Sequence, residues 1–427
     1  MKKFLRHIGF NNTKVWKLLK IFVADVYLFK TLRQIKSKQN ENGKLKILVI
    51  NHFFDGEIKE LLSHINGDDF SLKYIYPEPA FSRAFVWFPQ EIHNGQIPYN
   101  SEEVKAIRLR FNLFCEKLFW KLRENYKFDC IVTPSDIFFW LREFIVVAEK
   151  HGVFTIVADK EGTISPYDYL NEPSRIKAYY PPIAKYFFVW SARQKTFWIN
   201  SGVGKKAIKV IGSIRTDSFI NLPTFTSKKS VLYFDFDVDA YINNFDWNFL
   251  NWYGERTWVD LRDSFHRVIY KLALKYPDLI FNIKCHPQQI VSCFPEKLTH
   301  LKNVKIIKGA PKRIPFLIGQ SVLVLGFQTT ALLEASLANI PVIYGAWGKL
   351  FNSVKGSLLP WHESGFGFRW ARSEDQLEFF ALEYINKQVV SKKNRERINV
   401  YFYKSDGNVT NRFLKEIKKT ITVSKID

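Results

Sequence analysis

Residues Ser321–Ala335 read SVLVLGFQTTALLEA, a short apolar run that passes through Gly326 into a stretch opened by Gln328, Thr329 and Thr330. A run of valine and leucine that stops at a glycine is typical of a buried strand, and the residues after it favour a helix. Backbone N–H groups at the start of a helix attract anions, and threonine hydroxyls add donors. The stretch therefore predicts a phosphate site at a strand end, with plain capping of the helix by threonine as the alternative.

A second strand end carries the motif Lys284-Cys285-His286-Pro287. Pro287 has no backbone N–H and ends the strand, which leaves His286 at its carboxyl edge. A histidine there can donate to a phosphate oxygen or act as general acid, and Lys284 adds a positive charge; a histidine that caps a loop is the alternative. Because open α/β sheets bind ligands at such edges, the two strand ends predict a site for the phosphates of an activated donor. Glu334 is either an acceptor for a ribose or sugar hydroxyl or a surface carboxylate.

The composition is that of a folded and strongly basic protein. The 427 residues suggest two domains, and 47% hydrophobic residues with 12 tryptophans exclude a disordered chain. A net charge of +22 predicts attraction to nucleic acid, anionic lipid headgroups or phosphate-bearing substrates. With no secretory signal and no apolar run of about 18 residues, we expect a cytoplasmic protein without a spanning helix. The cysteines lack zinc-like spacing and are expected to be free thiols: Cys115, Cys130, Cys285 and Cys293.

Three segments follow from the alternation of apolar runs with amphipathic stretches. Residues 1–43 form a basic amphipathic segment, residues 44–222 a first α/β domain and residues 223–427 a second, with loop composition at 222–229. Residues 1–36 interleave aromatic side chains with lysine and arginine. This pattern fits either a helix lying on an anionic membrane or a helix packed on the protein body.

Short apolar runs predict the strands of two helix-covered parallel sheets. The runs are residues 44–51, 128–133 and 154–158 in the first domain, and 230–235, 280–285, 304–308, 322–326 and 341–344 in the second. Helices are predicted around residues 138–151, 258–275 and 328–338. Residues 66–100 are rich in proline and aromatic residues without a clean period, and we expect an irregular insertion there.

The first domain contains two polar candidates. Asp159-Lys160-Glu161-Gly162 follows an apolar strand, where one carboxylate can act as general base on an acceptor hydroxyl; a turn with solvated acids is the alternative. Residues 211–217 form a Gly-Ser turn at Ser213 followed by Arg215 and Asp217. We expect that stretch either to bind the donor phosphate or to hold the hinge by an ion pair.

Two stretches of the second domain are expected to have no chemical role. Residues 404–412 are interpreted as a structural turn, with Asp406 as a hinge contact and Asn408 or Thr410 starting the final helix. Three acids alternate after the first strand of the domain: Asp235, Asp237 and Asp239. They lack the glycine turn and distant glutamate of an EF-hand loop, so no metal site is predicted.

In their order along the chain, these segments resemble the motif series of bacterial surface-carbohydrate glycosyltransferases of GT-B architecture. The likeness is to polysialyltransferase-like and Kdo-transferase-like enzymes of capsule and lipopolysaccharide assembly, and to CDP-glycerol glycerophosphotransferases. It covers residues 128–412 through Asp159–Gly162, Gly212–Asp217, Lys284–Pro287, Thr329–Ala335 with Pro341, and Asp406–Arg412. The resemblance implies two Rossmann-like, doubly wound domains that face each other across a cleft.

The resemblance also implies roles for the motifs. The acid motif would supply the base, from Glu161 or Asp159; Lys160 interrupts the usual adjacent pair, and we favour Glu161 because it abuts the glycine. His286 would contact the donor phosphate and take part in catalysis. The other donor-binding candidates are Lys284, Pro287, Gly326, Gln328, Thr329, Thr330, Glu334, Arg215 and Ser213. Enzymes of this kind that use CMP-sugars need no metal, so none is expected here.

We therefore expect a glycosyltransferase on the inner face of the bacterial cell membrane. It would move a CMP-activated ulosonic acid, such as Kdo or a sialic-acid-like sugar, onto a surface glycan or lipid-linked acceptor. A polyol-phosphate transferase of the same fold that uses CDP-glycerol or CDP-ribitol is the alternative. The charge alone suggests a second alternative, a nucleic-acid-binding protein, but the sequence contains no recognisable nucleic-acid module.

Overall fold

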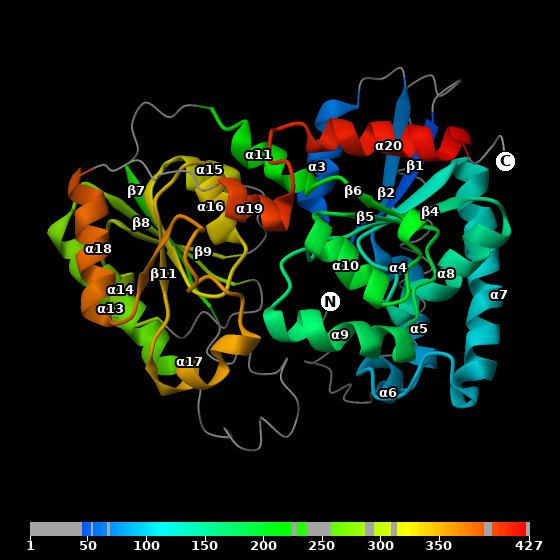
Figure 1. Ribbon diagram of the computed structural model, residues 1–427, viewed down its shortest axis with the longest axis horizontal. Helices are drawn as coiled ribbons and strands as arrows, with labels where there is room; N and C mark the ends of the chain where they lie inside the picture. Colours follow the sequence, from blue (N-terminus) through cyan, green and yellow to red (C-terminus); the bar gives the residue numbers. More distant parts are fainter. Residues whose placement is uncertain are drawn as a thin grey trace, which may run out of the picture.

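The computed structural model describes residues 45–52, 54–65, 69–223, 229–236, 258–286, 294–308, 314–387 and 395–423. Within these residues the chain forms two α/β units that lie side by side (Figure 1). The predicted amphipathic segment, residues 1–43, lies outside them, as do Asp237, Asp239, Pro287 and Cys293. None of the helices in the described part of the chain is long and apolar enough to span a membrane.

The first unit is built on a parallel sheet with the strand order β2-β1-β3-β4-β5-β6. Its strands are β1 Leu45–Ile50, β2 Phe70–Ile75, β3 Cys130–Thr133, β4 Phe154–Ala158, β5 Tyr186–Val189 and β6 Ile208–Val210. Alternate residues of β1 point to opposite faces of the sheet, and each face is covered by helices. This double burial explains why β1, β3 and β4 are visible in the sequence as near-continuous apolar runs.

The helices of the first unit account for the longer amphipathic stretches. Their bounds are α3 Asp55–His64, α4 Pro77–Phe81, α5 Ala84–Trp87, α6 Gln90–His93, α7 Glu102–Asn125, α8 Phe139–Lys150, α9 Pro166–Tyr179, α10 Ala192–Asn200 and α11 Asp217–Ile220. Two 3-10 turns are η1 Lys205–Ala207 and η2 Ile214–Thr216. The expectation of an irregular insertion at residues 66–100 is wrong, because β2 and α4–α6 lie there. The strand escaped notice because β2 lies at the edge of the sheet and mixes apolar with polar residues.

The second unit has a parallel sheet with the strand order β12-β11-β10-β7-β8-β9. Its strands are β7 Ser230–Phe234, β8 Ile280–Lys284, β9 Val304–Ile307, β10 Ser321–Gly326, β11 Val342–Gly345 and β12 Phe368–Ala371. Its helices are α13 Val259–Lys275, α14 Glu296–Thr299, α15 Ile314–Gly319, α16 Ala331–Leu337, α17 Gly348–Val354, α18 Glu374–Lys387 and α19 Arg395–Phe402, with the 3-10 turn η4 Lys355–Ser357. The predicted fold class of two doubly wound α/β units is confirmed.

In each sheet the strand order reverses once. The reversal lies between β1 and β3 in the first sheet and between β7 and β10 in the second. At such a switch point the connections leave in opposite directions, which opens a crevice beyond the carboxyl ends of the two strands. The strand ends predicted to hold the donor, those of β8 and β10, therefore lie at and beside the switch point of the second sheet.

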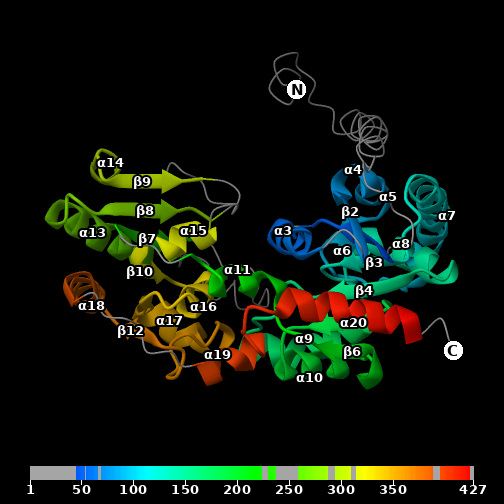
Figure 2. The ribbon, with the colours of Figure 1, turned by 90° about the horizontal axis from the view of Figure 1, so that it is seen from above.

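The last helix, α20 Val409–Val423, packs on the first unit and not on the second (Figure 2). Its buried residues Phe413 and Ile417 share a core cluster with strands of the first sheet and with α3. The sequence-based boundary placed residues 223–427 together. The structure instead takes the chain from the first unit to the second and back again.

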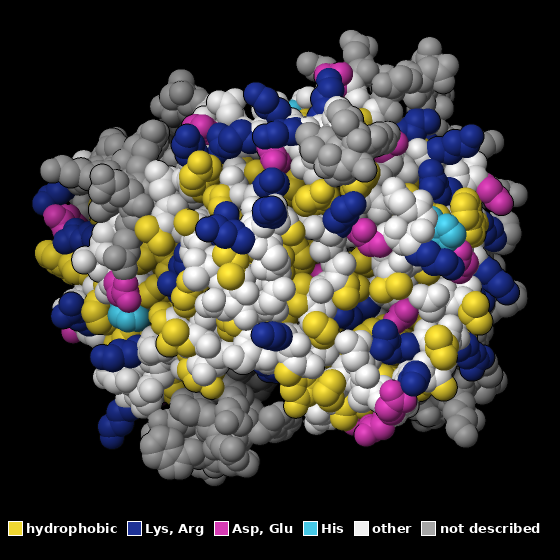
Figure 3. Space-filling view, turned by 45° about the vertical axis from the view of Figure 1, so that its right-hand side comes forward, with side chains coloured by type: hydrophobic (Ala, Val, Ile, Leu, Met, Phe, Trp, Pro, Cys, Tyr) yellow, Lys and Arg dark blue, Asp and Glu magenta, His cyan; other side chains and the backbone are white. Residues whose placement is uncertain are grey.

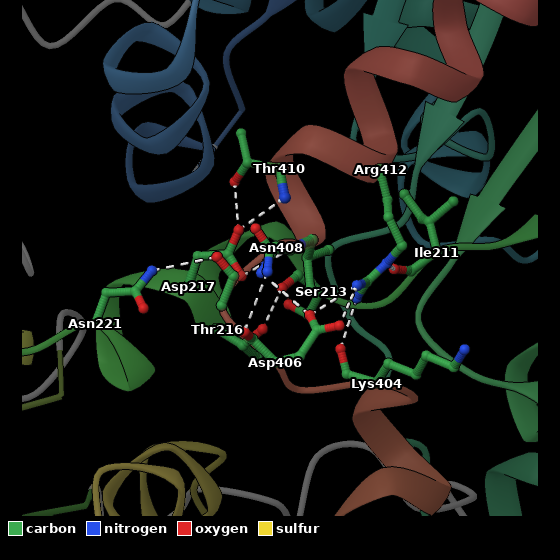
Figure 4. Close-up of polar contacts among 12 residues, drawn as sticks. Ile211, Ser213, Thr216, Asp217, Asn221, Lys404, Asp406, Asn408, Thr410 and Arg412 are labelled. Atoms are coloured by element: carbon green, nitrogen blue, oxygen red, sulfur yellow. Dashed lines mark hydrogen bonds and ion pairs between the residues drawn. The ribbon is translucent and has the colours of Figure 1, made fainter.

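A buried carboxylate fixes the point where the chain returns (Figure 4). Asp217 accepts hydrogen bonds from the backbone N–H groups of Val409 (3.0 Å) and Thr410 (2.7 Å) and from the Thr410 hydroxyl (2.8 Å). Nearby, Arg412 donates two hydrogen bonds of 2.7 Å to Asp406. The structural role predicted for residues 404–412 is thus confirmed, and Asp217 acts as the cap of α20.

Candidate functional site

A cavity of about 210 Å³ opens at the switch point of the second sheet. The ends of β7, β8 and β10 and the start of α16 line it, and one side chain, Arg215, comes from the first unit. The lining residues are Arg215, Phe234, Asp235, Phe236, Lys284, Cys285, His286, Ile314, Phe327, Gln328, Thr329, Thr330, Ala331 and Glu334. The structure therefore brings most of the predicted donor-binding residues to one place.

The end of β8 supplies a buried cation and an exposed imidazole. Lys284 is only 6% exposed, and its ammonium donates a 2.6 Å hydrogen bond to the carbonyl of Cys285. Burial lowers the pKa of Lys284 because the charged form loses solvation. His286 is exposed where the strand ends, as predicted from the motif. An anion in the cavity would restore the solvation that the Lys284 ammonium lacks.

At the end of β10, the Gln328 side chain is bonded within the protein, whereas threonine hydroxyls face the cavity. The Gln328 amide donates to Tyr344 Oη (2.8 Å) and to the Leu359 carbonyl, and its oxygen accepts from the Leu359 N–H (2.6 Å). The Gln328 side chain is thus used within the second unit. Thr330 makes no capping hydrogen bond to α16, which has seven residues. Thr329 also lines the cavity, and its hydroxyl accepts from the Ala331 N–H at 3.3 Å, so both hydroxyls can donate to a ligand.

Gly326 does not line the cavity but shapes it. A Cβ atom at Gly326 would lie 3.1 Å from a methyl group of Leu332 in α16. The missing side chain lets the helix approach the strand end closely. Ser213 also lies away from the lining; it is buried, and its carbonyl accepts from the Thr216 hydroxyl at 2.7 Å.

An ion pair joins the two units at the cavity. Arg215, in η2 of the first unit, contacts Glu334, in α16 of the second. The Glu334 side chain is 1% exposed, and its Oε2 has no hydrogen-bond partner among the described residues. Burial raises the pKa of Glu334 and outweighs the opposing effect of the guanidinium. The ion pair agrees with the hinge alternative for Arg215. Arg215 also borders the cavity, and its binding of a donor phosphate stays a prediction.

The two carboxylates of the acid motif in the first unit have different environments. Asp159 follows β4, and its carboxylate accepts from Trp198 Nε1 (2.7 Å) and from the N–H of Glu161 (3.1 Å). Burial raises the pKa of Asp159 to about 7. The Glu161 side chain, by contrast, is 74% exposed and lies 3.5 Å from the Lys160 ammonium. Asp159 is held by protein donors, while Glu161 is the carboxylate that an incoming molecule can reach.

Packing explains why the motif has a glycine at position 162. A Cβ atom at Gly162 would lie 2.1 Å from the Trp190 ring. The Trp190 indole also donates a 2.6 Å hydrogen bond to the Asp159 carbonyl. The tryptophan therefore clamps the turn that presents Glu161.

Sequence reasoning missed one carboxylate, Glu57 in the first turn of α3. It is 5% exposed, and its Oε1 has no hydrogen-bond partner among the described residues. Burial raises its pKa, while the charges of Arg215 and Lys160 lower it. Glu57, Lys160, Glu161, Arg215 and Glu334 thus form one cluster of interacting charges between the units. The sequence did contain one signal for Glu57, which is its position seven residues after β1. Residues that follow a strand at a switch point lie near the crevice.

The first acid of the Asp235 series is also buried. Asp235 accepts a 2.8 Å hydrogen bond from Tyr233 Oη and lies 3.3 Å from Nε2 of His266. Within the described ranges, no group of three or more His, Cys, Asp or Glu side chains is arranged to hold a metal ion. Cys115, Cys130 and Cys285 are free, as the sequence predicted, and all three are buried.

No protein-family model and no curated protein matches this chain, but solved structures share its fold. A UDP-GlcNAc 2-epimerase from Neisseria meningitidis, bound to UDP-GlcNAc, is 13% identical with a TM-score of 0.51 over 88% of this chain and 100% of its own. A putative UDP-N-acetylglucosamine 2-epimerase from Listeria monocytogenes is 12% identical, with a TM-score of 0.54 over 89% and 97%. The wall teichoic acid polymerase TagF is 11% identical, with a TM-score of 0.50 over 97% and 99%.

These likenesses show the fold, which is the two-domain GT-B-like architecture that the sequence predicted. The cavity at the second switch point is the feature of this chain on which a function can be argued.

Proposed function

We propose that the protein is a nucleotide-sugar-dependent transferase whose donor binds in the cavity of the second unit. The observation that carries the proposal is the convergence of Lys284, His286 and Thr330 at the switch point, with Arg215 reaching in from the first unit. A buried ammonium, a guanidinium, an imidazole and a hydroxyl together suit the phosphate oxygens of an activated donor. Apolar walls from Phe234 and Phe327 suit the remaining, less polar part of such a ligand.

Within this proposal, Glu334 receives a hydroxyl of the donor's ribose or sugar. Its unpartnered Oε2 can accept one hydrogen bond while Arg215 holds the other oxygen. A buried carboxylate without a full set of partners is unfavourable, so a ligand hydroxyl would relieve that cost. The same ion pair would then help to align the two units around the bound donor.

Glu161 is proposed as the general base on the acceptor. Its carboxylate is exposed, and it lies close enough to Arg215 and Glu334 for their charges to interact. Asp159 is proposed to position Glu161, because it accepts the Glu161 N–H. His286 would lie on the donor side, where it would act as general acid or donate a hydrogen bond to a phosphate oxygen.

The proposed donor is a CMP-activated ulosonic acid, and the proposed acceptor is a bacterial surface glycan or lipid-linked glycan. In this proposal Lys284, His286 and Arg215 balance the charge of the leaving phosphate without a bound metal, so transfer should continue in EDTA. A CDP-glycerol or CDP-ribitol polyol-phosphate transferase is the second candidate. The TagF structure favours it, because that likeness extends over 97% of this chain.

The basic composition supports a position on the inner face of the cell membrane, because anionic headgroups attract Lys and Arg. Nucleic acid is not proposed as a partner. On the face drawn in Figure 3, Lys and Arg side chains are spread over both units. Nucleic-acid proteins more often gather them on one binding face.

The test is nucleotide release by the purified enzyme with CMP-Kdo, CMP-sialic acid, CDP-glycerol or UDP-GlcNAc. We expect CMP release from a CMP-sugar, and loss of transfer in His286→Ala and Glu161→Ala with unchanged unfolding curves. His300→Ala and Glu296→Ala are matched controls, because these two side chains are exposed at the ends of α14, and both variants should keep full activity. CMP release from CDP-glycerol alone would favour the second candidate. Near wild-type turnover of both site variants would overturn the site assignment.

A further inference from the structure

The carboxyl edge of the first sheet carries polar side chains that the proposed donor site does not use. Asn51, His52 and Asp55 follow β1, a strand of the switch point, and Tyr76 follows the neighbouring strand β2. The Asp55 carboxylate accepts hydrogen bonds from the Asn51 amide (2.9 Å) and from the Tyr76 hydroxyl (3.3 Å). The Asn51 oxygen in turn accepts from the Phe54 N–H at 3.1 Å. These bonds hold three polar side chains together at an edge where open α/β sheets bind ligands.

Aromatic rings accompany these polar side chains. The rings of Tyr74 and Tyr76 lie 5.9 Å apart, edge to face, and the two residues are 41% and 49% exposed. The half-buried ring of His52 lies 4.8 Å from that of Phe138 and 5.2 Å from that of Trp140, which fixes the imidazole in place. Apolar ring faces and hydrogen-bonding atoms are thus available to one ligand. We call this set the first-sheet group: Asn51, His52, Asp55, Tyr74 and Tyr76.

The first-sheet group adjoins the donor cavity. The helix α3, which begins at Asp55, packs on η2, and η2 contains Arg215, which lines that cavity. Glu57, two residues after Asp55, interacts with the charge of Arg215. In Figure 2, α3 lies on the side of the first unit that faces the second. A molecule bound by the first-sheet group would therefore have one end near the donor.

The chemistry of the group differs from that of the donor cavity. The cavity offers the cations Lys284 and Arg215, whereas the one fully charged side chain of the first-sheet group is the acid Asp55. Burial and this carboxylate both raise the pKa of Tyr76. A phosphate or an acidic sugar would meet like charge at Asp55. An uncharged sugar would instead exchange hydrogen bonds between its hydroxyls and the carboxylate, amide and phenol, while its C–H face covers an aromatic ring.

We propose that the first-sheet group binds the terminal sugar of the acceptor, and that this sugar is uncharged. Its hydroxyls would bond to Asp55 and Asn51, and its apolar face would lie on an exposed tyrosine ring. The word acceptor rests on the proposed function, but the binding itself requires no donor. The inference narrows the acceptor to a glycan that ends in a neutral sugar, as opposed to one that ends in an acidic sugar.

The experiment is saturation-transfer NMR of the full-length protein with methyl glycosides, in the absence of nucleotide. The neutral probes are methyl β-galactoside, methyl β-glucoside and methyl N-acetyl-β-glucosaminide, and the acidic probe is the methyl glycoside of sialic acid. At least one neutral probe should receive saturation, and the acidic probe should receive much less. Tyr76→Ala should weaken binding of the neutral probe about tenfold, because the ring that covers the sugar is lost. Asp55→Asn keeps an oxygen for Asn51 and Tyr76 but removes the charge, so it should narrow the preference for neutral over acidic probes.

Asp260→Asn and Phe379→Ala are the matched controls. Asp260 is likewise an exposed first-turn aspartate, of α13, and Phe379 is 60% exposed on α18 of the second unit. Both controls should bind the neutral probe as wild type does, and all four variants should keep wild-type unfolding curves.

Three results would each overturn the inference. They are no saturation of any neutral probe by wild type, equal saturation of the acidic probe, and wild-type binding by both Tyr76→Ala and Asp55→Asn. Binding of CMP to the same proteins is followed separately by thermal shift. Absence of CMP binding to wild type would count against the proposed donor alone, because the saturation experiment contains no nucleotide.

Discussion

Substitution of Asp217 should loosen the whole contact between α20 and the first unit. The carboxylate is fully buried and accepts three hydrogen bonds from the first turn of α20, of 3.0, 2.7 and 2.8 Å. Loss of a helix cap lowers stability by about 1–2 kcal/mol, and each buried donor left unpaired adds about 1 kcal/mol or more. We therefore expect Asp217→Ala to lower the free energy of unfolding by about 4 kcal/mol.

Asp217→Asn should cost about half as much. The asparagine oxygen can still accept both bonds from Thr410, while its amide group opposes the Val409 N–H. The assay is urea denaturation followed by circular dichroism, with thermal unfolding as a second readout. For a domain of this size, a change of about 4 kcal/mol corresponds to a melting temperature lower by roughly 8–16 °C.

The control is Asp406→Ala, which removes the partner of Arg412 in the same region. That ion pair is partly exposed, with 26% and 46% of the two side chains accessible, so its loss should cost about 1 kcal/mol or less. If Asp217→Ala unfolded within 0.5 kcal/mol of wild type, or if Asp406→Ala were the more damaging change, the capping argument would be refuted.

Three further predictions concern the acid motif of the first unit and the ion pair that joins the two units. Gly162→Ala should lower stability by about 2–3 kcal/mol, because its Cβ would lie 2.1 Å from Trp190; Gly56→Ala, with open space around it, should be neutral or stabilising in the same urea titration. As the pH rises from about 4 to 7, Asp159→Asn should lose less stability than wild type does. The raised pKa of about 7 means that the folded wild type holds a proton there that the unfolded chain has released, and parallel pH profiles would contradict this. Arg215→Met should cost about 3 kcal/mol by leaving Glu334 buried alone, and Arg215→Met/Glu334→Leu should recover most of it; additive losses in the double-mutant cycle would disprove the coupling.

Most strands that the sequence revealed are buried on both faces, although the edge strand β9 was also predicted and the buried strand β5 was missed. β1, β3, β4, β8, β10 and β11 are apolar runs because helices cover both sides of each sheet, and parallel sheets need that cover. β2 was missed because an edge strand needs less apolar cover. The return of α20 to the first unit was missed for a different reason. It depends on contacts across about 190 residues, such as Asp217 with Thr410, which no local pattern encodes.

The candidate site was predictable to the extent that it follows from strand ends. Lys284, His286 and Thr330 gather at one cavity because carboxyl ends of neighbouring parallel strands share an edge. The use of Gln328 inside the protein could not be read from the sequence, because its partners, Tyr344 and Leu359, are brought in by tertiary packing. Ser213 is buried in a local turn, where its carbonyl accepts from the Thr216 hydroxyl. Glu57 is an acid in the first turn of α3, a position that acids commonly take in any helix. It becomes notable only in the structure, where it is buried and interacts with the charges of Arg215 and Lys160.

The double crossing of the chain also sets an order for biosynthesis. The apolar side chains of the first sheet that α20 covers, among them Val49 and Val132, stay without that cover until residues 409–423 have been made. The second unit has its own core and can collapse earlier, while the ribosome is still translating the final helix. The unit that is translated first is therefore completed last, and a chaperone bound during synthesis would be expected at its unfinished face.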